Sequence, residues 1–193
     1  MQMNQKCKWI NAPAEYTMDE AEICIVTEPK TDLWQKTYGG DSADNAPMLL
    51  WETCDKTFTF TVKVTYESDG LYDQAGIVLH QDENTWMKAS MECEGDIKHL
   101  GSVVTNRGFS DWASVDFPKD KKVMWYRMNR KENDFLLEYS EDGHNFSVLR
   151  MSHIWDLADT INIGLYACSP RESSFKAFFT DIKYESGDSV QIS

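Results

Sequence analysis

The stretch "QAGIVLHQDENTWMKASMECEG", Gln74 to Gly95, indicates the fold more clearly than any other part of the chain. Apolar and polar residues alternate with a period of two in both halves, and the polar segment "DEN" (Asp82–Asn84) separates the halves. Such alternation on either side of a short polar turn is typical of a β-hairpin. We therefore predict strands over Gln74–His80 and Thr85–Glu94.

The alternation also assigns each side chain of these strands to one of two faces. A third predicted strand, Lys122–Arg130, divides in the same way. The apolar members, which we expect to face the core, are Ala75, Ile77, Leu79, Met87, Ala89, Met91, Cys93, Met124, Tyr126 and Met128. The members of the opposite faces include Gln74, His80, Trp86, Lys88, Glu92, Trp125 and Arg127.

The same pattern continues along the rest of the chain. No apolar segment keeps a 3.6-residue period for three turns, and turn residues separate the runs. Many short strands at regular spacing predict an all-β sandwich, and without a repeat or a linker we expect a single domain over residues 1–193. The other predicted strands are Glu22–Thr27, Met48–Glu52, Thr57–Tyr66, Ser102–Thr105, Asp134–Ser140, Ser147–Met151, Ile161–Ala167 and Ser174–Tyr184.

Charge limits the partners that the chain can have. Against 19 Lys and Arg stand 32 Asp and Glu, a formal net charge of −13, and the acids are spread along the whole length. Binding to nucleic acid needs a clustered positive surface, whereas the only tight basic run is Lys119, Lys121 and Lys122, interrupted by Asp120. We therefore expect no nucleic-acid partner, and we interpret the basic run as a loop.

Cysteines and terminal patterns bear on localisation. The five cysteines are odd in number, far apart and without a C-x-x-C pair, so they predict neither a disulfide framework nor a zinc knuckle. The N-terminal residues lack the apolar core of a signal peptide, and no segment approaches the length of a transmembrane helix. We expect a cytoplasmic protein with no membrane partner, no metal and no cofactor.

Several stretches of the chain resemble a known family in residue identity as well as in the pattern of apolar and polar residues. They read "TDLWQKTYGGDSADNAPMLL" (Thr31–Leu50), "YDQAGIVLHQDENTWMKASMECEGDIKHLGSVVTNRGFSDW" (Tyr72–Trp112), "FLLEYSEDGHNFSVLR" (Phe135–Arg150) and "IGLYACSP" (Ile163–Pro170). The chain resembles the domain of unknown function 1349 family, regulation-of-enolase-like, of the concanavalin A-like lectin/glucanase superfamily. The resemblance implies a two-sheet antiparallel jelly-roll β-sandwich with a concave face. It implies little about activity, because that superfamily includes glycosidases, polysaccharide lyases and binding modules.

The concave face is the predicted binding site. Tryptophans on non-core faces, together with both signs of charge, suit stacking on sugar rings and hydrogen bonding to hydroxyls. From "FSDW" (Phe109–Trp112) we predict a rim of this site, with Ser110 beside Trp112. The alternative is that loops or a second molecule cover these tryptophans. The predicted ligand-binding residues are Gln74, His80, Trp86, Lys88, Glu92, Ser110, Trp112, Trp125 and Arg127.

Catalytic signatures are weak. Retaining glucanases of the superfamily carry the motif E-x-D-x-x-E on one strand. The most similar segment of this chain, "MECEGD", places Glu92 and Glu94 on one face of a strand but does not complete the motif. The Q-x-H motif of alginate lyases of this fold is absent, although Gln74 and His80 could supply parts of a lyase site. No G-x-S-x-G elbow, metal-binding histidine pair or P-loop occurs. Enzyme status stays open, with Glu92 as the first acid to test.

Three functions remain open on the sequence. The first is carbohydrate recognition through the concave face. The second is a glycoside-active enzyme of non-standard signature. The third is a cytoplasmic protein-interaction or regulatory domain whose exposed aromatic residues bind another protein or a second copy of the chain.

Overall fold

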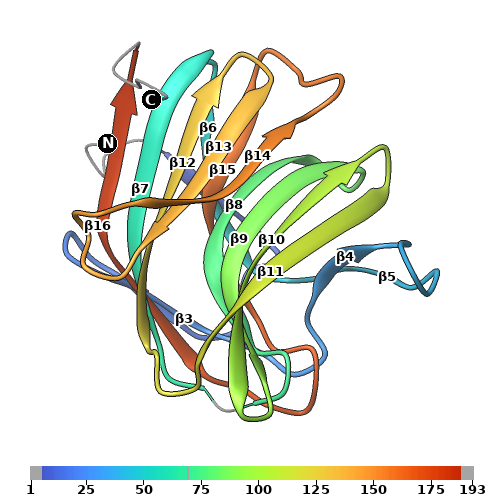
Figure 1. Ribbon diagram of the computed structural model, residues 1–193, viewed down its shortest axis with the longest axis vertical. Coiled ribbons are helices and arrows are strands. Elements are labelled where there is room, and N and C mark those ends of the chain that lie inside the picture. Colours follow the sequence, from blue (N-terminus) through green and yellow to red (C-terminus); the bar gives the residue numbers. More distant parts are fainter. Residues whose placement is uncertain (1–5, 69, 188–193) are drawn as a thin grey trace.

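A computed structural model describes residues 6–68 and 70–187, and in these residues the chain forms β-strands, turns and no helix (Figure 1). Sheet A has the order β1-β6-β15-β8-β9-β10-β11. Its strands are β1 (Cys7–Ile10), β6 (Met48–Thr53), β15 (Ile161–Cys168), β8 (Gln74–Asp82), β9 (Thr85–Glu94), β10 (Ile97–Asn106) and β11 (Phe109–Pro118). Within the described part of the chain, no helix is long and apolar enough to cross a membrane.

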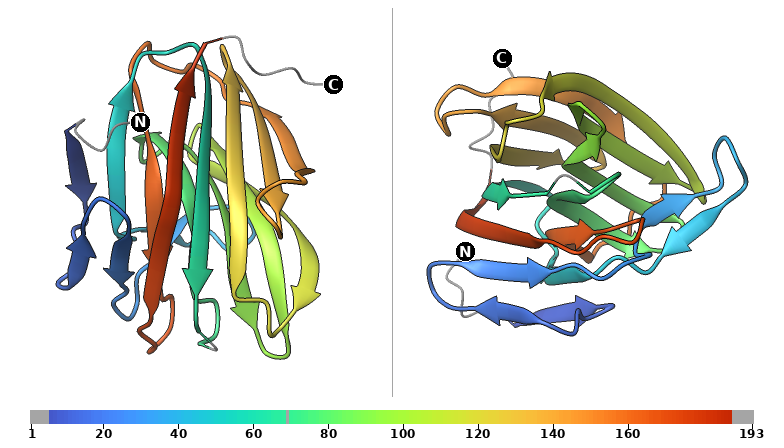
Figure 2. Two further views of the ribbon diagram at one scale, coloured as in Figure 1. Left: turned by 90° about the vertical axis from the view of Figure 1, so that its left-hand side faces the viewer. Right: turned by 90° about the horizontal axis from the view of Figure 1, so that it is seen from below.

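Sheet B packs against sheet A, and all neighbouring strands within each sheet are antiparallel (Figure 2). Its order is β14-β13-β12-β7-β16-β3-β2. Its strands are β14 (Ser147–His153), β13 (Asp134–Ser140), β12 (Val123–Lys131), β7 (Thr57–Tyr66), β16 (Lys176–Ser186), β3 (Ile23–Val26) and β2 (Tyr16–Met18). This arrangement confirms the predicted all-β, two-sheet antiparallel jelly-roll sandwich.

The main core lies between the two sheets. All of the apolar side chains predicted to face it are buried, and Ile77 of β8 lies in one cluster with Phe60 of β7 and Tyr126 of β12. Burying a side chain of this size stabilises the fold by about 1.5–3 kcal/mol. The face assignments made from alternation on β8, β9 and β12 are therefore confirmed for the core side.

The predicted hairpin is also confirmed. Strand β9 has the predicted bounds, and β8 runs two residues further, to Asp82. The register pairs Gln74 with Glu92, and His80 with Trp86. Since directly paired residues point to the same face of a sheet, these residues all lie on the side of sheet A away from the core, which we call the outer face.

A second, smaller apolar cluster covers the middle of this outer face. A two-stranded hairpin of β4 (Leu33–Gln35) and β5 (Ser42–Asp44) lies beside sheet A (Figures 1 and 2). Its Leu33 packs with Trp86 and Tyr166 of the sheet. The backbone N–H of Gln35 donates to Ser110 Oγ at 2.9 Å, which ties the hairpin to β11. The outer face is therefore closed at its centre.

Candidate functional site

The outer face of sheet A contains a buried cation next to the covering hairpin. Lys88 of β9 is only 4% exposed, and its Nζ donates to Gln74 Oε1 at 2.9 Å. Asp32, which precedes β4, places a carboxylate oxygen 3.9 Å from the same Nζ. An ammonium is tolerated away from water only when such partners compensate its charge. The ion pair therefore links the hairpin segment to the sheet.

Aromatic rings complete the surroundings of Lys88. Its Nζ lies 5.4 Å from the centre of the Tyr166 ring and 5.8 Å from that of Trp86, within cation–π range. The Tyr166 hydroxyl donates to Gln74 Oε1 at 3.3 Å. These contacts engage Lys88 Nζ and Gln74 Oε1 inside the protein, so both residues hold the outer face together.

Glu92 lies next to this cluster, at the edge of the buried region. It pairs with Gln74 of β8 on one side and with His99 of β10 on the other. Burial raises the pKa of the Glu92 carboxyl to about 7, against a smaller lowering by the Lys88 ammonium. Glu92 is thus a carboxyl that can change its protonation state near neutral pH.

His99 lies between two carboxylates that face the solvent. Its Nε2 is 2.9 Å from Glu94 Oε2, and its Nδ1 is 3.0 Å from Asp116 Oδ1. The Asp116 contact follows from the register of β10 with β11, which pairs the two residues. The imidazole is therefore held in one orientation, with both ring nitrogens engaged.

Trp112 lies beside His99 and remains 45% exposed. The two rings meet edge to face, with centroids 6.0 Å apart. Gly101 makes room for the indole, since a Cβ on that residue would come within 2.8 Å of Trp112 Nε1. We call Trp112, His99, Glu92, Glu94 and Asp116 the Trp112 surface. It combines an open aromatic ring with hydrogen-bond acceptors, an arrangement suited to a hydroxyl-bearing ligand.

Three other predicted ligand-binding residues on the outer face are buried. Trp86 is fully buried in the cluster under the β4–β5 hairpin, and its Nε1 donates to the Glu83 carbonyl. The prediction that Trp86 is exposed is therefore wrong. The alternative, that a loop covers this tryptophan, is correct. His80 is 9% exposed, at the opposite end of β8 from Gln74. Ser110 is buried and accepts the hydrogen bond that anchors β4.

The prediction that Trp125 and Arg127 share the concave face is wrong. Both belong to β12, which is a strand of sheet B, and they point away from the core on the far side of the molecule. The Arg127 Nε donates to Glu138 Oε2 at 2.7 Å, and its guanidinium stacks on Phe146 at 3.8 Å. Alternation reports which face a side chain takes within its own sheet, and it carries no information on which sheet the strand joins.

Sequence reasoning missed part of the Trp112 surface. His99 and Asp116 were not predicted, because only Ser102–Thr105 of β10 and none of β11 were recognised as strand. Extending the alternation of β10 back from Val103 would have placed His99 on the outer face. Asp116 had no such signal, since β11 is an edge strand exposed on both faces.

No metal centre is found in the described ranges, where no group of three or more His, Cys, Asp and Glu side chains could hold an ion. His99, Glu94 and Asp116 are joined by hydrogen bonds.

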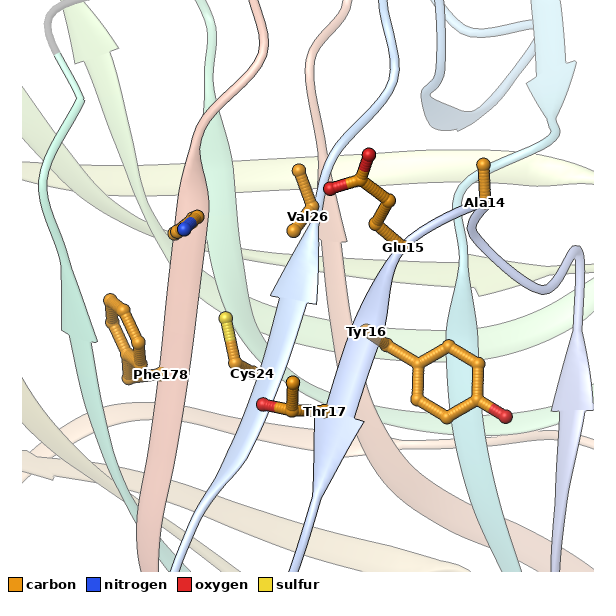
Figure 3. Close-up of a pocket in the computed structure, with 8 residues that line it drawn as sticks. Ala14, Glu15, Tyr16, Thr17, Cys24, Val26 and Phe178 are labelled. Carbon is orange, nitrogen blue, oxygen red and sulfur yellow. The ribbon is translucent and has the colours of Figure 1, made fainter.

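A separate shallow groove of about 490 Å³ lies on the outer side of sheet B, over β2, β3 and β16. Cys24 and Val26 lie on its floor between Phe178 and Thr17 (Figure 3). Burial raises the pKa of the Cys24 thiol, which keeps it in the unreactive neutral form. The groove combines an apolar floor with the polar side chains of Glu15, Thr17 and Lys176. We take the Trp112 surface as the candidate site because it joins an exposed indole to a hydrogen-bonded histidine and two carboxylates.

Comparison with known proteins identifies similar chains. Residues 9–187 match the family described as "Protein of unknown function (DUF1349)". "Regulation of enolase protein 1" of Saccharomyces cerevisiae is 30% identical over 173 residues, which are 90% of this chain and 86% of that protein. The crystal structure of a functionally unknown protein from the same yeast has a TM-score of 0.88 and 27% identity, covering 94% of this chain and 97% of the other.

The fold also resembles part of a larger protein. The crystal structure of xylan beta-1,4-xylosidase from Bacillus halodurans C-125 has a TM-score of 0.68 at 12% identity. The match covers 85% of this chain and 32% of the xylosidase chain. At this identity the likeness concerns the sandwich fold alone.

Proposed function

Since this chain belongs to the DUF1349 family of proteins of unknown function, we propose from its own geometry that it binds a neutral carbohydrate on the Trp112 surface. The observation that carries the proposal is the half-exposed Trp112 ring beside His99, which Glu94 and Asp116 hold in place. The similarity of the fold to part of a xylosidase supports a sugar ligand by analogy.

Stacking supplies the first part of the recognition. The apolar face of a sugar ring can cover the exposed part of the Trp112 indole, whose edge contact with the His99 ring restrains its position. A restrained aromatic side chain loses little entropy when a ligand stacks on it. Trp112 is therefore the residue whose loss should weaken binding most.

Hydroxyl recognition supplies the second part. Glu94 and Asp116 are exposed carboxylates, and each has an oxygen that can accept a hydrogen bond from a sugar hydroxyl. Hydrogen bonds to charged acceptors are worth about 1.5–3 kcal/mol each. Two such bonds together with the stacking contact are enough for specific, low-affinity binding of one or two sugar units.

Charge favours a neutral sugar over an acidic one. The Trp112 surface carries three acids, Glu92, Glu94 and Asp116, in a chain whose formal net charge is −13. A uronate or sulfated sugar would meet like charges at the site and over the whole molecule, which slows its approach and weakens its binding.

The test is binding of the purified chain to an array of neutral and acidic glycans, followed by titration of the best ligands with tryptophan fluorescence. We expect a neutral glycan to bind, and Trp112→Ala to remove the binding. The matched control is Trp155→Ala, because Trp155 is similarly exposed but contacts His153 and Arg107 instead of the Trp112 surface. Equal loss in both variants, or no binding to any neutral glycan, would refute the proposal.

A second candidate, a glycoside-active enzyme, is favoured by one observation. The pKa of Glu92 is raised to about 7, while Glu94, two residues further along β9, is exposed. A protonated carboxyl near an ionised one is the pairing that glycosidases use as general acid and second carboxylate. Turnover of a neutral glycan that Glu92→Gln abolishes, with binding retained, would support it. Binding without turnover by the unmodified chain would exclude it for the glycans tested.

A further inference from the structure

We propose that β11, the outer edge strand of sheet A, pairs with β11 of a second copy of the chain, so that two copies share one continuous sheet. The proposal goes beyond carbohydrate binding and does not depend on it. An edge strand presents backbone N–H and C=O groups that have no neighbouring strand, and natural proteins protect such edges with short length, bulges, proline or lysine. Figure 1 shows β11 at the end of sheet A.

Strand β11 lacks these protections. It has 10 residues, whereas the other edge strands of the two large sheets, β1, β2 and β14, have 4, 3 and 7. Its register with β10 is continuous, it contains no lysine or arginine, and its one proline is its last residue. The edge strand of sheet B, β14, packs against β10, so β11 extends past sheet B and is exposed on both faces.

The hairpin turn shows which backbone groups of β11 are available. Arg107 and Gly108 form a two-residue turn with positive φ angles of 52° and 76°, as in a type I′ hairpin. The residues that flank such a turn exchange backbone hydrogen bonds, and bonded positions then alternate along the two strands. Phe109 and every second residue after it therefore bond to β10. Among the residues that the structure describes, no strand pairs with the outward backbone groups, which belong to Ser110, Trp112, Ser114 and Asp116.

A two-fold antiparallel pairing centred on Ala113 matches these groups to each other. It places Ser110 opposite Asp116 of the second copy, and Trp112 opposite Ser114 of the second copy. Each of these pairs can exchange two backbone hydrogen bonds. The terminal proline of β11, which has no N–H, stays outside the paired stretch. The same strand serves on both sides, as a closed two-fold interface requires.

The acids of β11 do not oppose this pairing. Asp111 lies 2.6 Å from Arg150 Nη2, and Asp116 lies 3.0 Å from His99 Nδ1, so each has a partner within its own chain. Like charges directly opposite each other would destabilise a pair of strands. The register centred on Ala113 avoids this, because Asp111 then faces Val115 of the second copy.

The two ends of β11 are complementary to each other. Lys36, which follows β4, lies at the first end, with its Nζ 5.6 Å from the centre of the Phe109 ring. Pairing puts Phe109 opposite Phe117 of the second copy, and so brings Lys36 of each copy near Asp116 of the other. Phe109 is 61% exposed in the single chain, and a second copy would cover it. This match between the two ends of one strand identifies the partner as a second copy.

Sedimentation velocity of the full chain tests the proposal, from low micromolar to millimolar concentration. The salt concentration is about 0.15 M, where charge interactions beyond about 8 Å are largely screened. We expect the average mass to rise from that of one chain toward that of two. Ala113→Glu should weaken association about tenfold or more, because it sets two like charges against each other on the two-fold axis. Met151→Glu is the matched control, since it adds the same charge at an exposed position of β14 and should associate as the unmodified chain does.

Cysteine cross-linking tests the register, in chains that carry Cys54→Ser because Cys54 is exposed. In Ala113→Cys the two Cα atoms should lie about 4.5 Å apart across the axis, a separation that a disulfide can span. In the control Val115→Cys the two cysteines should lie four residues apart along the strands, about 13 Å, which is too far. Oxidised glutathione should therefore link Ala113→Cys into a dimer and leave Val115→Cys unlinked.

Circular dichroism of all variants confirms that each is folded. A single chain at every concentration would overturn the proposal, as would equal association of Ala113→Glu and Met151→Glu. Equal cross-linking of the two cysteine variants would overturn it as well, because a dimer formed through another surface does not distinguish these positions.

Discussion

Replacing Glu92 by Gln should make the protein more stable at alkaline pH. Glutamine has the shape of the protonated carboxyl, and burial raises the pKa of the Glu92 carboxyl from 4.5 to about 7 in the folded protein. Between these pH values the folded chain holds a proton that the unfolded chain has lost. The stability that Glu92 contributes is therefore complete below about pH 4.5 and is lost as the pH rises to about 7.

The size of the change in the free energy of unfolding follows from the shift of the Glu92 pKa. One pKa unit corresponds to about 1.4 kcal/mol, so a shift of about 2.5 units corresponds to about 3 kcal/mol. The partial exposure of Glu92 and the attraction of Lys88 make this an upper figure. Glu92→Gln should thus match the unmodified protein near pH 4 and exceed its free energy of unfolding by about 1–3 kcal/mol near pH 8.

The assay is urea denaturation of both proteins across this pH range, followed by tryptophan fluorescence. The difference between the two free energies of unfolding isolates Glu92, because all other titrating groups are common to both chains. Glu92→Met provides a control, since it removes the charge and the hydrogen-bonding atoms together. Its free energy of unfolding, relative to that of the unmodified protein, should change with pH in the same way as that of Glu92→Gln but differ from it by a constant amount. A difference that stays constant with pH, or one that falls as the pH rises, would refute the assignment of a buried, protonated Glu92.

Three further predictions concern the covering hairpin, the Trp112 surface and the core. Ser110→Ala should lower the free energy of unfolding, measured by urea denaturation, by about 2–4 kcal/mol, because it leaves the buried Gln35 N–H and the Thr105 hydroxyl without their partner. A loss no larger than that caused by Ser114→Ala on the same strand would contradict this prediction. Gly101→Ala should displace the Trp112 ring, because the added Cβ would lie 2.8 Å from its Nε1. The tryptophan emission should change while the far-UV circular dichroism changes little. An unchanged emission spectrum would show that the ring is not held beside Gly101. Ile77→Ala should lower the free energy of unfolding by about 2–5 kcal/mol, as expected for a fully buried core residue, and a loss below about 1 kcal/mol would mean that the core is packed differently.

Local periodicity was enough to predict most of the strands. Successive side chains of a strand point to opposite faces, so a strand that is buried on one side shows an alternation of apolar and polar residues in the sequence. Strands β9 and β13 have the predicted bounds, and the core side of β8 is the predicted one. Strand β11 was missed for the same reason, because it is an edge strand with exposed residues on both faces and shows no apolar alternation.

The candidate site could be predicted only in part. Glu92 and Trp112 were named from the sequence, and both lie on the Trp112 surface. His99 and Asp116 joined them through the register of β10 with β11, which sequence spacing alone did not reveal. Trp86 was expected to be open to ligands, whereas residues about 50 positions earlier in the chain cover it.

The sequence by itself determined the class of fold, the hairpin at its centre and the side chains that form the core, because these depend on the geometry of a single strand and its turns. Tertiary structure decided which strands share a sheet and what covers the outer face. The Lys88–Asp32 ion pair and the Ser110–Gln35 hydrogen bond join segments 56 and 75 residues apart, and together they close the centre of that face. Contacts at such separations follow from how the strands assemble, so the His99 and Asp116 side chains beside Trp112 were identified only in the folded molecule.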